Sequence, residues 1–256
     1  MNNLSILFTI CGRAGSKGFK NKNLKELEGV PLVYYSLAAI RCFHEQYSRY
    51  SVSVALNTDS TALKKLIEDQ TIIDHIRLCE RKEELSGDLV PKVDVIRDTY
   101  LMCSENTSFD AIVDVDITSP FRRAEDIEGV LGILNSNERI EVAFSVVPSR
   151  RSPYFNMVEE KHNGLFQRIC EKGYTARQQA PLTYEMNASI YAYRPRMLEK
   201  KMDGTILDCN CGIYTMPDYL VLDIDSEEDF EMMEYLLPYY ARRDESLKKI
   251  YECARR

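Results

Sequence analysis

The stretch LSILFTICGRAGSKGFKNKNLK, residues 4–25, decides the fold. Residues 4–10 form a short apolar run that predicts a buried strand, and a loop rich in glycine and positive charge follows at once. Its glycines and cations are Gly12, Gly15, Gly18, Arg13, Lys17, Lys20, Lys22 and Lys25. Ligands of open α/β sheets bind beyond the carboxyl ends of strands, where glycines let the backbone approach an anion. The stretch therefore favours a polyphosphate site.

The glycine spacing differs from that of two familiar phosphate loops. Only two residues separate Gly12 from the Gly15-Ser16-Lys17 triplet, whereas the nucleoside-triphosphate P-loop has four. The dinucleotide fingerprint G-x-G-x-x-G is also absent from the stretch. A solvated basic loop is the alternative, since runs of charge are usually solvated. The loop alone leaves both interpretations open.

The composition excludes several classes of protein. With 256 residues, 45% of them hydrophobic and 29% charged, we expect one globular domain, with or without a lobe. A net charge of −7 argues against a nucleic-acid partner, and no apolar run approaches the ~20 residues that cross a bilayer. The amino terminus lacks the charge and cleavage pattern of a signal peptide. Eight scattered cysteines indicate reduced thiols, so a cytoplasmic protein is expected.

Strand and helix signals alternate along most of the chain, which predicts an α/β fold. The expected helices span residues 32–43, 61–68, 91–103, 124–135, 226–240 and 244–256. The expected strands span residues 51–56, 72–78, 110–115, 142–147, 188–193 and 219–224. Alternation of this kind implies βαβ units with right-handed crossovers. We therefore expect a doubly wound, mostly parallel sheet in a Rossmann-like layer sandwich.

Residues 149–186 interrupt this alternation. They contain short β-like runs without a clear amphipathic helix, so we interpret them as an inserted flap within a single domain, residues 1–256. Apolar side chains in the insertion have little helix to cover them; they include Tyr154, Phe155, Leu165 and Phe166. Exposed apolar patches mark interaction surfaces. The insertion is therefore the expected docking site of a partner subunit.

Two pairs of aspartates stand where strands are expected to end. They are Asp114 and Asp116 in VDVDITSPF, and Asp223 and Asp225 in VLDIDSEEDF. Residues two apart in a strand share one face, and buried carboxylates are costly unless they are paired or bind a metal. Magnesium favours one or two carboxylates together with phosphate oxygens. The alternative is that Asp225 caps a helix and Asp114 pairs with an arginine, and the residues alone do not decide.

Five separate motifs resemble one enzyme family. GRAGSKGFKNKNL, with PLVYYSLAAI after it, resembles the signature of the acylneuraminate cytidylyltransferases, or CMP-nonulosonate synthetases. DITSPFR is similar to their T-S-P-L-R turn and VLDIDSEEDF to their D-x-D-[ST]-x-x-D motif, while TARQQAP and MNASIYAY are similar to the R-Q-x-x-P and N-x-x-I-Y runs. NASIYAY with RRSPYFNMVE looks closest to the legionaminic acid branch. Asp116 departs from the pattern, because many members carry Gln there; Cys11 and Ala14 are milder departures.

The resemblance implies roles for individual residues. The implied catalytic set is Arg13, Lys17, Lys22, Asp223 and Asp225, of which the two aspartates would hold Mg²⁺ or Mn²⁺. The implied nucleotide-binding set is Arg13, Ala14, Gly15, Ser16, Lys17, Lys22, Asn23, Arg81 and Asp116. The implied sugar-binding set is Lys92, Thr118, Ser119, Arg122, Arg177, Gln178 and Asn187.

The reaction that the resemblance implies joins CTP to a nine-carbon 2-keto-3-deoxy sugar acid. The anomeric hydroxyl of a legionaminic, N-acetylneuraminic or related nonulosonic acid would attack the α-phosphorus, and pyrophosphate would leave. The resemblance also implies a homodimer. Two other functions remain open: a nucleotidylyltransferase that acts on sugar phosphates, and a non-catalytic nucleotide-binding module. Arg177, whose guanidinium can bind a carboxylate with two hydrogen bonds, suits a free sugar acid better than a sugar phosphate.

Overall fold

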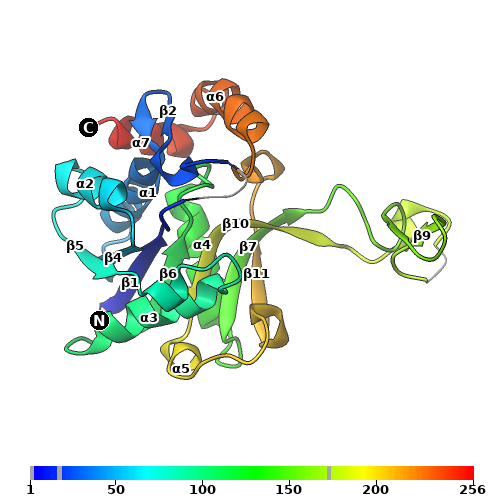
Figure 1. Ribbon diagram of the computed structural model, residues 1–256, viewed down its shortest axis with the longest axis horizontal. Helices are drawn as coiled ribbons and strands as arrows, with labels where there is room; N and C mark the ends of the chain where they lie inside the picture. Colours follow the sequence, from blue (N-terminus) through cyan, green and yellow to red (C-terminus); the bar gives the residue numbers. More distant parts are fainter. Residues whose placement is uncertain (1–2, 16–18, 172–173) are drawn as a thin grey trace.

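The computed structural model describes residues 3–15, 19–171 and 174–256. It consists of a layered body from which a long arm projects to one side (Figure 1). Among the described residues, none of the helices is long and apolar enough to cross a membrane.

The body is built on a sheet of seven strands in the order β11-β7-β10-β6-β1-β4-β5. These strands are β1 (Leu4–Cys11), β4 (Tyr50–Thr58), β5 (Ile76–Glu80), β6 (Ala111–Val115), β7 (Val142–Pro148), β10 (Tyr184–Tyr193) and β11 (Cys211–Thr215). Every neighbouring pair is parallel except those of β10, which runs antiparallel to both β6 and β7. The predicted mostly parallel sheet is confirmed. The reversed strand is the one that returns directly from the arm.

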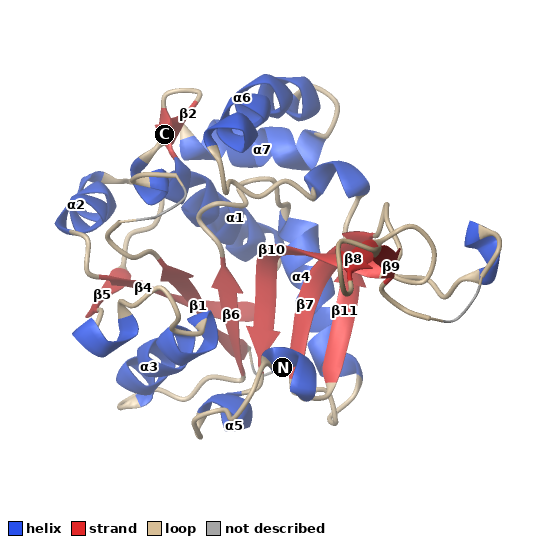
Figure 2. Ribbon diagram, turned by 45° about the vertical axis from the view of Figure 1, so that its right-hand side comes forward, coloured by secondary structure: helices blue, strands red, loops and turns tan. Residues whose placement is uncertain are grey.

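Helices cover both faces of the sheet, as a doubly wound fold requires. They are α1 (Leu32–Gln46), α2 (Thr61–Asp69), α3 (Lys92–Ser104), α4 (Ala124–Ser136), α5 (Pro195–Leu198), α6 (Glu227–Ala241) and α7 (Glu245–Ala254). Figure 2 shows α3 in front of the strands and α1 and α4 behind them. Consecutive residues of β1 divide between the two layers, because strand side chains alternate. Leu7 packs in the cluster that contains Ile96 of α3, whereas Phe8 packs with Ile40 of α1.

Local capping explains where two of the helices begin. The Ser60 side chain accepts a hydrogen bond from the backbone N–H of Leu63 at 3.2 Å, which starts α2. At α6, Ser226 and Asp229 exchange side-chain to backbone hydrogen bonds of 3.1 and 2.9 Å. This reciprocal pair is a capping box, and it fixes the start of the helix predicted at residues 226–240.

The predicted strand at residues 219–224 is wrong. Its first residues belong to the short 3-10 helix η5 (Asp218–Leu220), and the rest has no regular structure. Leu220 and Ile224 are buried and the backbone N–H of Ile224 donates to Thr118 O at 3.0 Å, so the segment packs as a coil. The edge beside β7 is taken by β11, which was not predicted. A short apolar run fits a buried coil as well as a strand.

The strand predicted at residues 72–78 begins four residues later, as β5 (Ile76–Glu80). The Gln70 side chain explains the shift, because its Oε1 accepts hydrogen bonds from the backbone N–H groups of Ile72 and Ile73 at 2.6 and 2.9 Å. These amides are held in a turn and do not enter the ladder.

The arm leaves the sheet after β7 and returns as β10 (Figure 1). It carries the two-stranded sheet of β8 (Val158–Glu160) and β9 (Phe166–Arg168) and the 3-10 helix η3 (Arg177–Gln179). Several apolar side chains on it are mostly exposed, namely Val158, Leu165, Phe166 and Leu182 at 62, 66, 64 and 87%. The arm coincides with the predicted insertion, except that β10 already begins at Tyr184.

Candidate active-site cleft

Glycines bring the loop after β1 close to the sheet. The N–H of Gly12 donates to Asn57 O at 3.1 Å, and a Cβ on Gly12 would lie 2.6 Å from Leu63 Cδ2 and 2.8 Å from Ile117 Cδ1. Any larger residue would therefore displace the core. Gly15 has φ +80°, a left-handed conformation that glycine adopts at little cost. Ser16 and Lys17, which the sequence placed at the triphosphate, lie outside the described residues.

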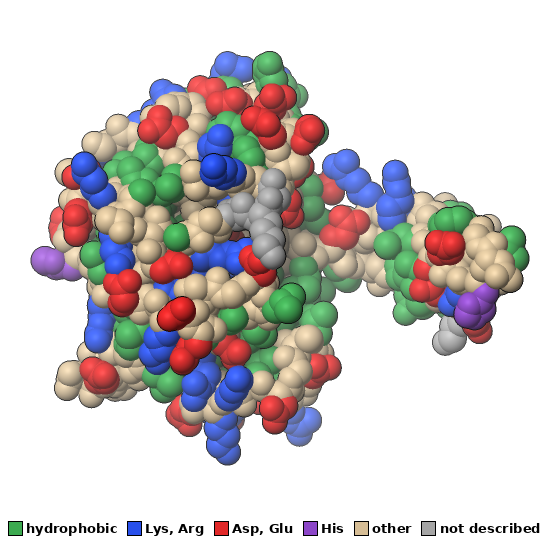
Figure 3. Space-filling view, in the orientation of Figure 1, with side chains coloured by type: hydrophobic (Ala, Val, Ile, Leu, Met, Phe, Trp, Pro, Cys, Tyr) green, Lys and Arg blue, Asp and Glu red, His purple; other side chains and the backbone are tan. Residues whose placement is uncertain are grey.

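A cleft of about 300 Å³ opens where this loop meets the carboxyl ends of β1, β5 and β6. Figure 3 shows acidic and basic side chains close to one another on the middle of the face of the body that it presents. The cleft gathers eight of the predicted site residues from distant segments, namely Arg13, Lys22, Asn23, Arg81, Lys92, Asp116, Thr118 and Asp223. It is lined by Cys11, Arg13, Lys22, Asn23, Arg81, Leu85, Gly87, Asp88, Val90, Lys92, Val95, Asp116, Thr118 and Asp223.

Lys22 connects the basic loop to the second aspartate pair. Lys22 lies in the 3-10 helix η1 (Lys22–Leu24), and its Nζ is 3.0 Å from Asp225 Oδ1 and 3.0 Å from Ile224 O. The neighbouring Asn23 donates from Nδ2 to Arg13 O at 3.3 Å, which ties the loop to η1. Of the predicted catalytic residues, Arg13, Lys22 and Asp223 therefore line one cleft, and Lys22 connects that cleft to Asp225.

Two arginines reach the cleft in different ways. Arg13 forms an ion pair with Asp88 and keeps about a third of its side chain exposed. Arg81 is buried; its Nε donates to Asn57 Oδ1 at 3.0 Å and its Nη2 to Asn57 O at 3.2 Å. Burial lowers the pKa of the Arg81 guanidinium, because a neutral amide and not a carboxylate holds it. A negatively charged ligand in the cleft would stabilise the charged form of the Arg81 guanidinium and so offset the effect of its burial.

The turn after β6 holds the first aspartate pair against Lys92, the first residue of α3. Lys92 Nζ lies 2.7 Å from Asp114 Oδ2 and also contacts Asp116 Oδ2. The other oxygen of Asp116 accepts hydrogen bonds from Thr118 N and Oγ1 at 3.1 and 3.0 Å. Burial alone would raise the pKa of Asp116, but the Lys92 ammonium outweighs it and lowers that pKa to about 2.

Asp223 faces the same turn from the opposite side. Ser119 Oγ donates to Asp223 Oδ1 at 3.1 Å and lies 3.3 Å from Asn187 O. Burial raises the pKa of Asp223, and repulsion from Asp116 and Asp225 raises it further. A cation bound between these carboxylates would stabilise the ionised form of Asp223 and so lower its pKa.

The donors at the cleft suit a hard divalent cation that also binds phosphate. Asp223 and Asp225 offer carboxylate oxygens, which Mg²⁺ prefers, and a bound cation would offset both the burial and the neighbouring carboxylates that raise the pKa of Asp223. In the described parts of the chain, no three His, Cys, Asp or Glu side chains are grouped closely enough to hold a metal by themselves. Magnesium bound here would therefore take part of its coordination from phosphate oxygens and water.

Two residues of the implied sugar-binding set have other contacts. Arg122 is fully buried, and its guanidinium donates to Asp116 O, Ser119 O at 2.6 Å, Ser36 Oγ at 3.3 Å and Ser189 Oγ at 3.2 Å. Asn187 is also buried, and its side chain bonds with Ser145 Oγ at 2.6 Å and Leu220 O at 3.4 Å. The Arg122 side chain therefore holds the 116–119 turn, and the Asn187 side chain joins β7 to the segment at Leu220. Neither residue lines the cleft.

Arg177 and Gln178, also of the implied sugar-binding set, lie in η3 on the arm and are not among the residues that line the cleft. Arg177 Nη2 donates to Ser149 O at 3.1 Å. Within one chain, the structure does not bring these two side chains to Lys22 and Asp225.

Comparison with known proteins settles the family. A family model described as "Cytidylyltransferase" matches residues 7–250. The chain belongs to the cytidylyltransferase family. A member named CMP-N,N'-diacetyllegionaminic acid synthase, from Campylobacter jejuni, is 33% identical over 91% of this chain and 94% of its own. Post-translational flagellin modification protein B of Campylobacter coli is 31% identical over the same shares.

More distant cytidylyltransferases agree with this assignment. N-acylneuraminate cytidylyltransferase of Streptococcus agalactiae is 27% identical over 95% of this chain and 56% of its own length. Among solved structures, CMP:2-keto-3-deoxy-manno-octonic acid synthetase, complexed with CTP, has a TM-score of 0.65 and 15% identity, and covers 92% of this chain and 99% of its own. At that identity the likeness extends to the fold, which is the predicted Rossmann-like sandwich.

The sequence did not single out three residues that position the predicted site of this cytidylyltransferase. Asn57 orients Arg81, Asp59 Oδ1 accepts a hydrogen bond from Ala14 N at 2.6 Å, and Asp88 pairs with Arg13. Asn57 and Asp59 directly follow the strand that the sequence predicts at residues 51–56. Their position at the end of a predicted strand was the available signal, because β4 ends at the same edge as β1.

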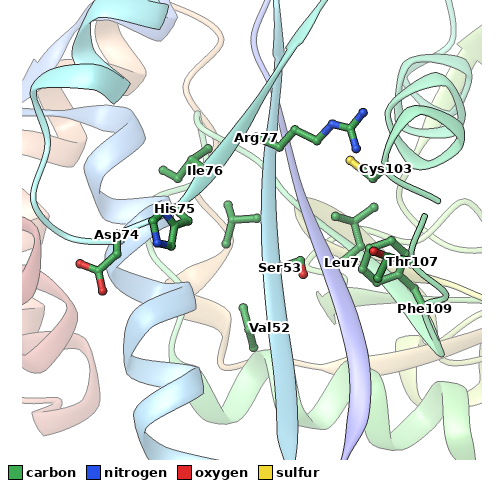
Figure 4. Close-up of a pocket in the computed structure, with 11 residues that line it drawn as sticks. Leu7, Val52, Ser53, Asp74, His75, Ile76, Arg77, Cys103, Thr107 and Phe109 are labelled. Atoms are coloured by element: carbon green, nitrogen blue, oxygen red, sulfur yellow. The ribbon is translucent and has the colours of Figure 1, made fainter. Parts of the chain in front are cut away.

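A larger hollow of about 510 Å³ lies elsewhere in the cytidylyltransferase fold (Figure 4). It is lined by Leu7, Val52, Ser53, Val54, Asp74, His75, Ile76, Arg77, Cys103, Thr107 and Phe109. Figure 4 shows Asp74 and His75 on one side and Thr107 and Phe109 on the other. The hollow lies toward the amino-terminal parts of β4 and β5, and none of the predicted site residues lines it. The cleft at the carboxyl ends of the strands is therefore the candidate active site.

Proposed function

We propose that this chain transfers the cytidylyl group of CTP to a nonulosonic acid, such as legionaminic or N-acetylneuraminic acid, and releases pyrophosphate. The observation that carries the proposal is the meeting of Lys22 with Asp225, beside Asp223 and Arg81, in one cleft. The similarity to a CMP-N,N'-diacetyllegionaminic acid synthase over nearly the whole chain supports the choice of acid.

The cations of the cleft would neutralise the triphosphate and the pyrophosphate that leaves. Lys22 and Arg13 both have aspartate partners, so each can exchange a carboxylate for a phosphate oxygen when CTP binds. Transfer at phosphorus depends mainly on positioning and charge stabilisation, and one such group commonly contributes ~3–4 kcal/mol to the transition state. Arg81, which Asn57 holds rigidly, is proposed to contact the base or its ribose.

We propose Mg²⁺ or Mn²⁺ as the cofactor, held by Asp223 and Asp225. When bound, it would act as a Lewis acid on phosphate and sugar oxygens and lower the pKa of the attacking hydroxyl. Ser119 fixes one Asp223 oxygen, and Lys22 restrains Asp225 until CTP arrives. The carboxylates are thus oriented before the substrates bind.

The acid is proposed to bind in a second, more apolar hollow of about 290 Å³ that adjoins the cleft. Its lining includes Val93, Tyr191, Tyr193 and Ile206, and it shares Lys92 and Asp116 with the cleft. Mixed apolar and polar walls suit a deoxy sugar acid with acylated amines.

We also propose that two copies of this chain form a homodimer through the arm, in the cytoplasm. The exposed Leu165 and Phe166 of the arm would be covered by the second copy. In such a dimer, Arg177 and Gln178 could serve the cleft of the partner chain. The eight cysteines are all free, which fits a reducing compartment.

The test is an assay of pyrophosphate and CMP-sugar with purified protein, CTP and Mg²⁺. The acids to compare are N,N'-diacetyllegionaminic, N-acetylneuraminic, pseudaminic and deaminated neuraminic acid, with sugar phosphates as the alternative substrates. We expect turnover with at least one free acid and none after chelation of the metal. Turnover with sugar phosphates alone would favour the alternative transferase, and no turnover with any acceptor would favour a binding module.

A further inference from the structure

Lys92 lies between two carboxylates at the floor of the cleft. Its Nζ is 2.7 Å from Asp114 Oδ2 and contacts Asp116 Oδ2, while 34% of the Lys92 side chain remains exposed. Asp114 is fully buried in β6, and Thr9 Oγ1 of β1 donates to its other oxygen at 2.9 Å. Both carboxylates are therefore fixed by the sheet and the turn after it, and Lys92 is held by them.

The charge balance of this trio limits what Lys92 can bind. The two aspartates are balanced by the Lys92 ammonium and by the buried Arg122 guanidinium, which donates to Asp116 O, so the group offers no excess positive charge to a phosphate or a carboxylate. The ammonium has three N–H donors, of which one donates to Asp116 and a second faces Asp114 in an ion pair. The third can donate to a neutral acceptor, such as a hydroxyl or an amide oxygen. Both oxygens of Asp116 already accept hydrogen bonds, which leaves it poorly placed as a metal ligand.

Lys92 also lies where the two hollows meet. Together with Asp116 it lines both the cleft at Arg81 and the more apolar hollow at Tyr191 and Tyr193. Tyr191 of β10 is paired with Asp114 of β6. A residue that lines the second hollow and a residue that holds Lys92 are therefore neighbours in the sheet.

We propose that Asp114 is a positioning residue: with Asp116 it holds the Lys92 ammonium so that Lys92 donates to a neutral oxygen of the acid substrate and not to CTP. This inference rests on the proposed function. Lys92 then contributes to the binding of the acid, and Asp114 acts only through Lys92.

The test compares wild type with Asp114→Asn, Lys92→Met and the double variant, with KM measured separately for CTP and for an acid that the wild type uses. Losing a hydrogen bond from a charged donor commonly costs ~tenfold or more in affinity, so Lys92→Met should raise the KM for the acid by about that factor. The KM for CTP should stay unchanged. Asp114→Asn should raise the KM for the acid less, and should add nothing in the Lys92→Met background.

Two further variants keep the test decisive. Asp98→Asn, which removes the Lys82–Asp98 ion pair from the same helix α3, is the matched control and should change neither KM. Thr9→Val removes a bond to Asp114 without changing charge, and should reproduce part of the Asp114→Asn effect if that variant folds poorly.

The outcomes separate the inference from the function on which it rests. If the wild type is active and Lys92→Met raises the KM for CTP and the KM for the acid equally, the inference is overturned and the proposed function stands. The same holds if the double variant has a KM for the acid that is raised by the product of the two single effects. A folded wild type that forms no CMP-sugar with any acid overturns the proposed function and this inference together.

Discussion

Lys22 Nζ lies 3.0 Å from Asp225 Oδ1, although the two residues are 203 positions apart in the sequence. This contact joins the glycine-rich loop at one end of the chain to the segment before α6 at the other. It is accessible to ligand, because 77% of the Asp225 side chain is exposed. The predictions below follow from this cleft and from the arm.

Lys22→Met should lower kcat by roughly 100-fold or more, because one fixed cation is lost from the developing charge of pyrophosphate. Asp225→Ala and Lys17→Ala should likewise abolish measurable turnover, with the fold intact by circular dichroism. The control is Lys64→Met on α2, which removes the ion pair of Lys64 with Glu80 of β5. Near-normal rates of cytidylyl transfer by Lys22→Met or Asp225→Ala would show that the substituted residue does not have the catalytic role proposed for it.

Asp223→Asn should raise the Tm of the metal-free protein while it abolishes activity. Burial and neighbouring carboxylates raise the pKa of Asp223, so its ionised form costs stability at neutral pH. That cost disappears as the pH falls below the unfolded pKa of about 3.9, so the two Tm values should converge there. Thermal unfolding measured from pH 7 to about pH 3, with and without Mg²⁺ and CTP, tests this. If the variant is less stable than wild type at pH 7 without metal, the proposed charge repulsion is wrong.

Arg122→Met should destabilise the fold by roughly 3 kcal/mol or more, because four buried oxygens lose a charged donor. Urea unfolding gives the loss directly. If Arg122 bound the sugar instead, the substitution would raise the KM for the acid and leave the unfolding midpoint in place. The two roles are therefore distinguished by one pair of measurements.

Phe166→Glu, combined with Leu165→Glu, should convert the proposed dimer into a monomer, because a charge in an apolar contact costs its desolvation. Analytical ultracentrifugation reports the mass. Tyr235→Glu is the control: it changes an aromatic side chain that is 81% exposed on α6, away from the arm. An unchanged mass in the arm variant would show that another surface joins the subunits, or that none does.

Sequence alone could locate the cleft, because the carboxyl ends of parallel strands meet at one edge. Lys22 and Asp116 could be assigned to that edge without knowledge of any contact, whereas Asp223 was assigned to it from a strand that the structure does not form. It could not show that Arg122 points into the protein, since this depends on Ser36 of α1 and Ser189 of β10 both reaching it. Those contacts are set by packing between elements that are distant in the chain.

The same limit explains the failed strand at residues 219–224. The apolar pattern there is real, and Leu220 and Ile224 are buried. The apolar pattern does not show which segment occupies each position in the sheet. The position beside β7 is occupied by β11. Asp223 is consequently held by a coil that hydrogen-bonds to Thr118, not by a strand.

The arm begins and ends at a single hydrogen-bonded pair: Ser149 N donates to Thr183 O at 2.9 Å where β7 and β10 separate. The two chain ends at that point already have the spacing of neighbouring antiparallel strands. A tight turn could therefore replace everything between them without disturbing a rung of the sheet. Deleting the arm in this way would separate the association of subunits from the chemistry that one chain carries out.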